Sequence, residues 1–255
     1  MKRKIAVLLF MCSMLAGCSH HTPTTPITTA GNGATRGPFH PPKAPSEDAV
    51  DLAVARRAAQ QRPESGRARF DLGMAYYRSG SYQDAIPELR NAIRILPKPP
   101  VIAYPYLAYS LEAVGQPQAA VSVMTELLAR PITPEDQSKA FLVRGNTLWA
   151  CGRVAEAKSD YQSSLAAYPQ QGSANYGLGI VAVAQGERRE ATRRFQAALR
   201  LGAKPYVRAA ALTALGELAE KDGNNKGATD YFRQALVEDK ENTYAASGLR
   251  RVTSP

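Results

Sequence analysis

Residues 141–169 read FLVRGNTLWACGRVAEAKSDYQSSLAAYP, and the same pattern of residue types recurs along the chain. It is repeated in FDLGMAYYRSGSYQDAIPELRNAIRILP at 70–97, in YGLGIVAVAQGERREATRRFQAALRLG at 176–202 and in LTALGELAEKDGNNKGATDYFRQALVED at 212–239. Self-similarity at a nearly fixed period indicates a repeat architecture, in which each unit packs against its neighbours.

Three series of small residues define the repeat, and all of them step by 35, 37, 34 and 37 residues. They are Gly73, Ala108, Gly145, Gly179 and Gly216, then Gly80, Gly115, Gly152, Gly186 and Gly223, and finally Ala85, Ala120, Ala157, Ala191 and Ala228. A glycine in the second series can end a helix in the left-handed conformation, while the other two series let helices pack closely. Four residues after the third series come large side chains that we expect to fill the space between the two helices: Leu89, Met124, Tyr161, Phe195 and Phe232. The spacing therefore predicts an all-α fold of paired helices.

These motifs resemble the tetratricopeptide repeat (TPR), a 34-residue helix–turn–helix unit. The resemblance covers about 48–252 and implies an α/α superhelix, or solenoid, of about five repeats with a capping helix at each end. Within a domain of 47–253, the repeats are expected at about 66–99, 101–134, 138–171, 172–205 and 209–242. Pro105 is expected to interrupt the first helix of the second repeat.

The start of the chain is of a different kind. Lys2, Arg3 and Lys4 precede an apolar run from Ile5 to Cys18, and this order is typical of a secretory signal. As a helix, the 14 residues of the run would span roughly 21 Å, which is short of the ~30 Å hydrocarbon core of a membrane. A signal peptide is therefore a better interpretation than a transmembrane anchor.

The end of the apolar run, Leu15-Ala16-Gly17-Cys18, resembles the lipobox of bacterial lipoproteins. The resemblance implies cleavage of a signal peptide of residues 1–17 and attachment of palmitate-type acyl chains to Cys18, and two or more such chains hold a protein stably at a membrane. Ser19, in place of an aspartate, implies sorting to the outer membrane, with the folded domain in the periplasm. An ordinary cleaved signal is the alternative.

Residues 18–46 are rich in Pro, Thr and Gly and contain almost nothing to bury. We expect them to be a disordered tether, with a reach of about 30 Å as a flexible coil.

The charge of the chain is basic, with a formal net value of +10. Seven net charges remain once the three basic residues of the signal peptide leave. Because an exported protein seldom meets nucleic acid, anionic lipid headgroups or an acidic protein partner fit this charge better.

The residues of catalytic chemistry are scarce. All three histidines, His20, His21 and His40, lie in the expected tether, so Cys151 has no histidine partner. Residues 177–182, GLGIVA, match a dinucleotide-binding fingerprint, but that motif needs a preceding strand, and Gly179 already has a place in the repeat. We therefore expect no enzyme activity, cofactor, metal site or small-molecule substrate.

The remaining candidates lie on the surface of the solenoid. The family resemblance implies that the first helix of each repeat lines a concave groove for a partner's amphipathic helix or extended segment. Its expected residues are Met74, Tyr77, Tyr106, Tyr109, Asn146, Trp149 and Tyr176. The alternative is that some of these rings pack within their own repeats. A possible second docking site is the helical stripe of Arg189, Arg193 and Arg200, for which a solvated face is the alternative.

A lipid anchor, a Pro-rich tether and a TPR domain together resemble the TadD-type lipoproteins of tight-adherence (Flp-type) pilus systems. The resemblance implies protein partners, namely a secretin or other pilus assembly proteins, and a role in pilus assembly or secretin placement. Two alternatives stay open: a type IV pilus pilotin, and an envelope adaptor that recruits peptidoglycan or quality-control enzymes. Neighbouring genes for a secretin and a secretion ATPase would favour the pilus interpretation over the adaptor.

Overall fold

The computed structural model describes residues 48–254. The expected signal peptide, Cys18 and the tether therefore lie outside the described residues. The described part of the chain forms twelve helices. Their bounds are α1 Asp48–Gln61, α2 Gly66–Arg78, α3 Tyr82–Ile95, α4 Ala103–Ala113, α5 Pro117–Leu128, α6 Pro134–Ala150, α7 Val154–Ala167, α8 Gly172–Ala184, α9 Arg188–Arg200, α10 Pro205–Lys221, α11 Asn225–Glu238 and α12 Thr243–Thr253.

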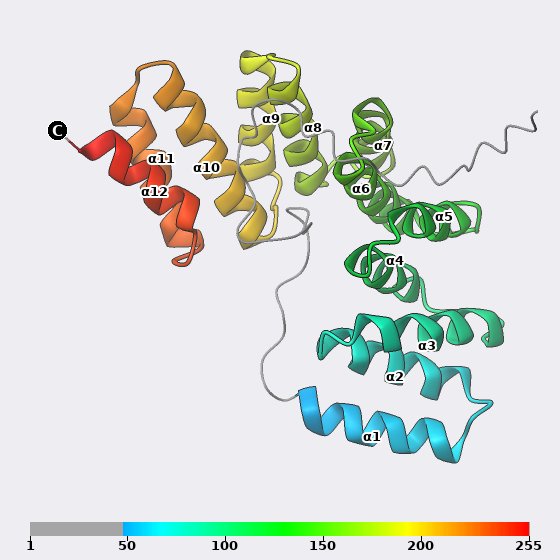
Figure 1. Ribbon diagram of the computed structural model, residues 1–255. Helices are drawn as coiled ribbons and strands as arrows, with labels where there is room; N and C mark the ends of the chain where they lie inside the picture. The colour runs from blue at the N-terminus through cyan, green and yellow to red at the C-terminus, as the bar shows by residue number, and fades with distance from the viewer. Residues whose placement is uncertain (1–47, 255) are drawn as a thin grey trace, which may run out of the picture.

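Helices α2 to α11 form five hairpins stacked in a curved row, with α1 at one end and α12 at the other (Figure 1). The first helices of adjacent hairpins contact each other, as α2 contacts α4 and α4 contacts α6. Among the described residues, the second helices of adjacent hairpins make no such contact. The first helices therefore line the concave side. This arrangement confirms the predicted all-α superhelix of five repeats with a capping helix at each end.

The turn inside every hairpin contains a glycine in the left-handed region, as the second series predicts. The φ angle lies between +73° and +80° at Gly80, Gly115, Gly152, Gly186 and Gly223. A Cβ added at any of them would meet no atom within 4 Å, so the need for glycine comes from the backbone and not from crowding. Other L-residues pay roughly 1–2 kcal/mol for this conformation.

Glycines of the first series are required for the opposite reason, since each lies against a large side chain of the second helix. A Cβ built on Gly145 would lie 2.9 Å from Tyr161 Cε1, and one on Gly179 would lie 2.5 Å from Phe195 Cε1. Both rings are buried, and so are the large residues at the other three predicted positions. The small and large positions thus fit together as expected.

Some of these rings also join one hairpin to the next helix. Tyr161 of α7 lies between Gly145 of its own hairpin and Gly177 of α8, where an added Cβ would come within 2.7 Å of the ring. Phe232 of α11 reaches the C-terminal cap in the same way, because a Cβ on Gly248 of α12 would lie 2.4 Å from its Cζ. Neighbouring units are therefore coupled by close ring-to-backbone contacts.

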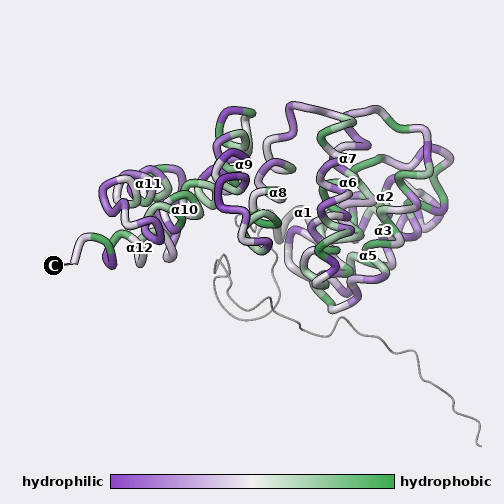
Figure 2. Tube along the Cα trace, turned by 90° about the horizontal axis from the view of Figure 1, so that it is seen from above, coloured by the Kyte–Doolittle hydropathy of each residue, from purple (hydrophilic) through white to green (hydrophobic). Residues whose placement is uncertain are grey.

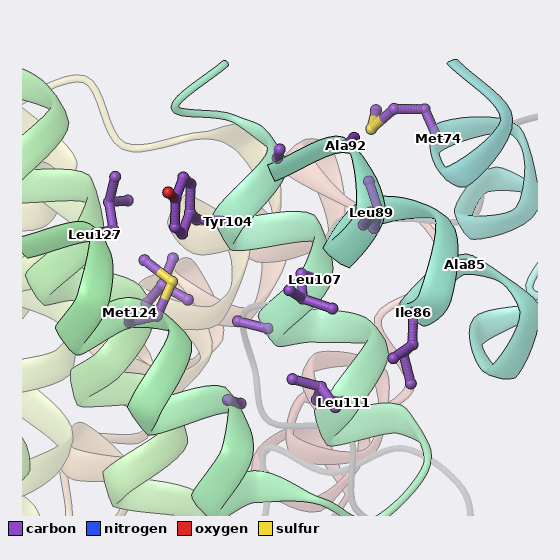
Figure 3. Packing of buried hydrophobic residues seen from close by; sticks show 14 of the residues in the cluster. Met74, Ala85, Ile86, Leu89, Ala92, Tyr104, Leu107, Leu111, Met124 and Leu127 are labelled. Atoms are coloured by element: carbon purple, nitrogen blue, oxygen red, sulfur yellow. The ribbon is translucent and has the colours of Figure 1, made fainter. Parts of the chain in front are cut away.

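The first two repeats share one core. Figure 3 shows Leu89 of α3, Leu107 of α4 and Met124 of α5 converging between the helices. They belong to a cluster of buried residues that extends from Phe70 of α2 to Val143 of α6. Stability in this part of the stack therefore depends on contacts between adjacent hairpins.

Three prolines lie in the first turns of helices, and two of them set helix starts that the repeat spacing does not give. Helices α6 and α10 begin at Pro134 and Pro205, four residues before the expected repeat starts at 138 and 209. Proline suits a first turn because its φ is already helical and no N–H is needed there. For the same reason Pro105, the third residue of α4, does not interrupt that helix, so the expected break is wrong.

Candidate partner-binding surfaces

Two of the residues expected in the groove lie in the core. Met74 is 8% exposed and Tyr176 is fully buried. The ring of Tyr176 packs against Phe195 of α9 with centroids 5.6 Å apart. For these two residues the alternative holds, since they pack within the stack and offer a partner almost no surface.

Three other expected residues come together where α2 meets α4. Tyr77 of α2 and Tyr106 and Tyr109 of α4 are all half-buried. The ring of Tyr77 meets Tyr106 edge to face at 4.7 Å between centroids, and it lies 6.5 Å from Tyr109. Tyr82 of α3 supports it from the other side at 5.5 Å. Such edge contacts hold the rings in fixed positions while part of each ring stays open to water.

The two candidates on α6 belong to the third repeat. Trp149 is half-buried and packs against two core clusters, one containing Tyr161 and the other Phe195. Asn146 lies one turn earlier, and its Oδ1 is buried without a hydrogen-bond partner among residues 48–254. A buried acceptor without a donor costs roughly 1–3 kcal/mol.

Tyr206 is an aromatic residue that the sequence interpretation missed. It packs against the same core cluster as Trp149. Burial raises the pKa of Tyr109 well above its usual range, and Glu112 and then Tyr206 add to the rise. Tyr206 therefore extends the tyrosine group of the first two repeats toward α10. Pro205 could have revealed Tyr206 in the sequence. A proline is common at the first position of a helix, so Pro205 predicts a helix start with Tyr206 in the first turn.

Together these half-buried rings form what we call the concave aromatic surface. It consists of Tyr77, Tyr106, Tyr109, Trp149 and Tyr206. The residues come from α2, α4, α6 and α10, which are all first helices of their hairpins. All five residues therefore lie on the helices that line the concave side of the stack.

Glu112 of α4 is an acidic side chain beside this surface. It is half-buried and accepts a hydrogen bond from the Thr147 hydroxyl of α6. Burial raises the pKa of Glu112 from 4.5 to about 7, and the bond from Thr147 opposes the rise. Burial also raises the pKa of Glu217 of α10 to about 7. The concave side thus holds carboxyl groups that titrate near neutral pH.

The second candidate site lies on α9, which is strongly hydrophilic (Figure 2). Arg189, Arg193 and Arg200 are all exposed. The first two line an open cavity of about 740 Å³ between α7, α8 and α9, and Arg200 does not. Arg193 is ion-paired with Glu190 of the same helix, and such exposed pairs contribute little. The three arginines therefore do not form one continuous recess.

The family model described as tetratricopeptide repeat matches residues 48–100, 107–172, 142–187 and 176–243. The chain belongs to the tetratricopeptide-repeat family. A TPR domain is typically a scaffold for protein interactions, so the coarse function of this chain is protein binding. By sequence comparison, no curated protein matches it.

Several solved TPR structures share the fold. The anaphase-promoting-complex heterotetramer Cut9–Hcn1 gives a TM-score of 0.67 at 21% identity over 81% of this chain, which spans only 39% of that longer one. PilF of Pseudomonas aeruginosa gives 0.63 at 17% identity, with 79% of this chain and 88% of that chain covered. PilW, whose structure is described as that of a widely conserved type IV pilus biogenesis factor, gives 0.60 at 19% identity, with 83% and 100% covered. At these identities, the likeness establishes the fold alone.

The TPR packing also accounts for the GLGIVA segment. It lies inside α8 and follows another helix, whereas a dinucleotide-binding motif must follow a strand. The rings of Tyr161 and Phe195 pack directly against Gly177 and Gly179. Helix packing therefore explains why both positions are glycine.

Other chemical features of the TPR domain are few. Cys151 is half-buried and directly follows the last residue of α6. Across residues 48–254, no three His, Cys, Asp or Glu side chains gather as a metal site would require. None of the helices in the described range has the length and apolar character needed to cross a membrane.

The raised pKa of Glu112 predicts a pH-dependent stability. The folded state holds this proton up to about pH 7, whereas an ordinary glutamate loses it near 4.5. The free energy of unfolding should therefore fall as pH rises through this window, and the loss is complete above pH 7. Glu112→Gln removes the titration. The difference in free energy of unfolding between the variant and the wild type should therefore be about 1–3 kcal/mol more favourable to the variant at pH 8 than at pH 5. Urea unfolding at the two pH values measures this gain, and an equal effect of the substitution at both would contradict it.

Proposed function

We propose that this chain is an outer-membrane-anchored TPR scaffold that binds a secretin or another pilus protein. In this role it assists assembly or secretin placement in a tight-adherence (Flp-type) pilus system. The observation that carries the proposal is the concave aromatic surface, which places five partly open rings on the concave side of a protein-binding fold.

Aromatic rings of this kind suit protein recognition. Tyr and Trp are enriched in the cores of protein interfaces, and a few of them supply most of the binding energy. The rings of Tyr77 and Tyr106 are held by edge contacts, so little side-chain freedom is lost on binding. An extended segment or an amphipathic helix of the partner would cover the open ring faces.

The pilus assignment draws on the sequence and on two structural neighbours. The lipobox and the Pro/Thr-rich segment favour a membrane-tethered scaffold, and the tether favours the tight-adherence system. The likeness to PilF and PilW, the latter described as a type IV pilus biogenesis factor, favours a second candidate function as a type IV pilus pilotin.

This role can be tested by deleting the gene for the protein. A strain without it should lose detergent-resistant secretin multimers from its outer membrane and should lose surface pili. Which pilus disappears separates the two candidates. Normal multimers and normal pili of both kinds would contradict the pilus assignment.

Membrane anchoring has its own test at Cys18. Cys18→Ser should abolish incorporation of labelled palmitate and release the protein from the membrane fraction, because the acyl chains carry the membrane affinity. Gly17→Ala is a suitable control, because it keeps a small residue before the cysteine. A Cys18→Ser protein that stays in the membrane, together with a wild type that takes no label, would refute the lipoprotein assignment.

A further inference from the structure

Helix α9 carries more positive charge than its place in the stack requires (Figure 2). Its 13 residues include five arginines and one glutamate, which gives a net charge of +4. The second helices of the other four hairpins, α3, α5, α7 and α11, each have a net charge of 0 or −1. The repeat fold alone therefore does not account for the arginines of α9.

The arginines gather on the side of α9 that faces away from the stack. The buried residues of this helix are Ala191, Phe195 and Ala198. At about 100° per residue, the opposite side consists of Arg189, Arg193, Gln196 and Arg200, which we call the α9 outer face. Among the described helices, α9 packs against α8 and α10 only, so no other helix covers this face. The face is about 17 Å long from its first arginine to its last.

Little of the charge on the α9 outer face is neutralised within the domain. Glu190 is shared between Arg193 and Arg194 of the same helix. Arg189 and Arg200 are exposed and form no ion pair with any residue of 48–254. At least two guanidinium groups are therefore available to an anionic partner.

The open cavity beside α9 has the same character. Its charged lining residues are Lys158, Arg188, Arg189, Arg193 and Arg194 on the basic side, and Glu187 and Glu190 on the acidic side. Positive charge thus exceeds negative charge along the cavity as well as on the α9 outer face. Guanidinium and ammonium groups of this kind bind phosphate through charge-assisted hydrogen bonds.

The composition of the α9 outer face favours a lipid surface over a folded protein as its partner. Binding energy in protein interfaces is concentrated in well-packed pockets, where Trp and Tyr are enriched beside Arg. The α9 outer face has no aromatic residue and no large apolar one. Charge alone does attract a protein to anionic headgroups, and each basic residue near the surface contributes. A flat surface also requires no recess, only an outward-facing helix that can lie along it.

We propose that the α9 outer face docks on the anionic phospholipid surface of the membrane to which the chain is anchored. The inference rests on the proposed function, because it takes the anchor at Cys18 as given. The expected tether has a reach of about 30 Å, which keeps the domain near the headgroups, so a weak attraction is enough for docking. Because α9 is a second helix of its hairpin, docking turns the concave side away from the lipid, where a protein partner can reach it.

Energy transfer from Trp149 can report how close α9 lies to the lipid. Trp149 is the chain's one tryptophan, and it packs against the core cluster that contains Phe195 of α9. The full chain is reconstituted in vesicles that contain dansyl-phosphatidylethanolamine as the acceptor. The vesicles consist of phosphatidylcholine alone or of an equimolar mixture with phosphatidylglycerol. Transfer should be stronger on the anionic vesicles and should fall to the neutral level in about 1 M salt, which screens exposed charges.

Two triple variants separate the α9 outer face from the net charge of the protein. Arg189→Gln, Arg193→Gln, Arg200→Gln should lower the ratio of docked to undocked protein about 100-fold, because each arginine contributes roughly a factor of five. The matched control removes three exposed arginines of other second helices, through Arg90→Gln, Arg94→Gln and Arg233→Gln. The control should keep the stronger transfer on anionic vesicles.

Equal transfer on the two kinds of vesicle would overturn the inference. Equal losses in the two triple variants would overturn it as well, because the effect would then follow net charge and not α9. A chain that takes the palmitate label and retrieves the secretin, yet shows no preference for anionic vesicles, keeps the proposed function without this inference. Conversely, transfer that depends on α9 in a chain that takes no label would support docking and refute the anchor.

Discussion

Gly145→Leu should lower the melting temperature of the protein by about 6–12 °C, corresponding to roughly 3 kcal/mol in a domain of this size. Even a single added Cβ would lie 2.9 Å from Tyr161 Cε1 and 3.2 Å from Asp160 Cβ. The ring has little room to move aside, because Gly177 of α8 also lies against it. The substitution thus disturbs two adjacent repeats at once, although leucine is the better helix former.

Two further variants separate packing from other effects. Ala150→Leu adds the same side chain at an exposed position of the same helix and should leave the melting temperature almost unchanged. Adding Tyr161→Leu to Gly145→Leu removes the ring and should recover part of the loss. If the Gly145→Leu protein melts like the wild type by circular dichroism at 222 nm, the repeat register is wrong.

The fold could be predicted because its rules are local. Every repeat needs a left-handed turn glycine and a small residue opposite a large one, so both are visible in the sequence. Because these positions recur with the same spacing in five repeats, the pattern is not a coincidence. Gly145 and Tyr161 illustrate this: the spacing of 16 residues that pairs them in the sequence also brings them into contact in the hairpin.

The candidate site could be predicted only in part, because repeat position does not fix how far a ring is buried. Met74 and Tyr109 occupy the same repeat position, one residue after the small residue of the first series, yet Met74 lies in the core and Tyr109 is half-buried. Tyr206 was missed because α10 begins one turn before the repeat does. The burial that raises the pKa of Glu112 arises from the approach of α6 to α4, which no single repeat encodes.

The second large effect concerns partner binding. Replacing Tyr109 and Trp149 together by alanine should abolish co-purification of the secretin, because central aromatic residues of an interface contribute about 2 kcal/mol or more each. Replacing Arg189, Arg193 and Arg200 should weaken association only mildly and mostly at low salt, since exposed charges act chiefly on association rate. Tyr168→Ala, which removes an exposed ring after α7, is the matched control and should bind normally.

The most direct test of the account is therefore a co-purification of the secretin with these three variants, each first shown to be lipidated and helical like the wild type. The account predicts that the Tyr109→Ala, Trp149→Ala protein retrieves no secretin while the arginine and Tyr168→Ala variants retrieve it. The opposite ranking, with the arginine variant inactive and the aromatic variant normal, would contradict it and place the docking site on the convex face at α9.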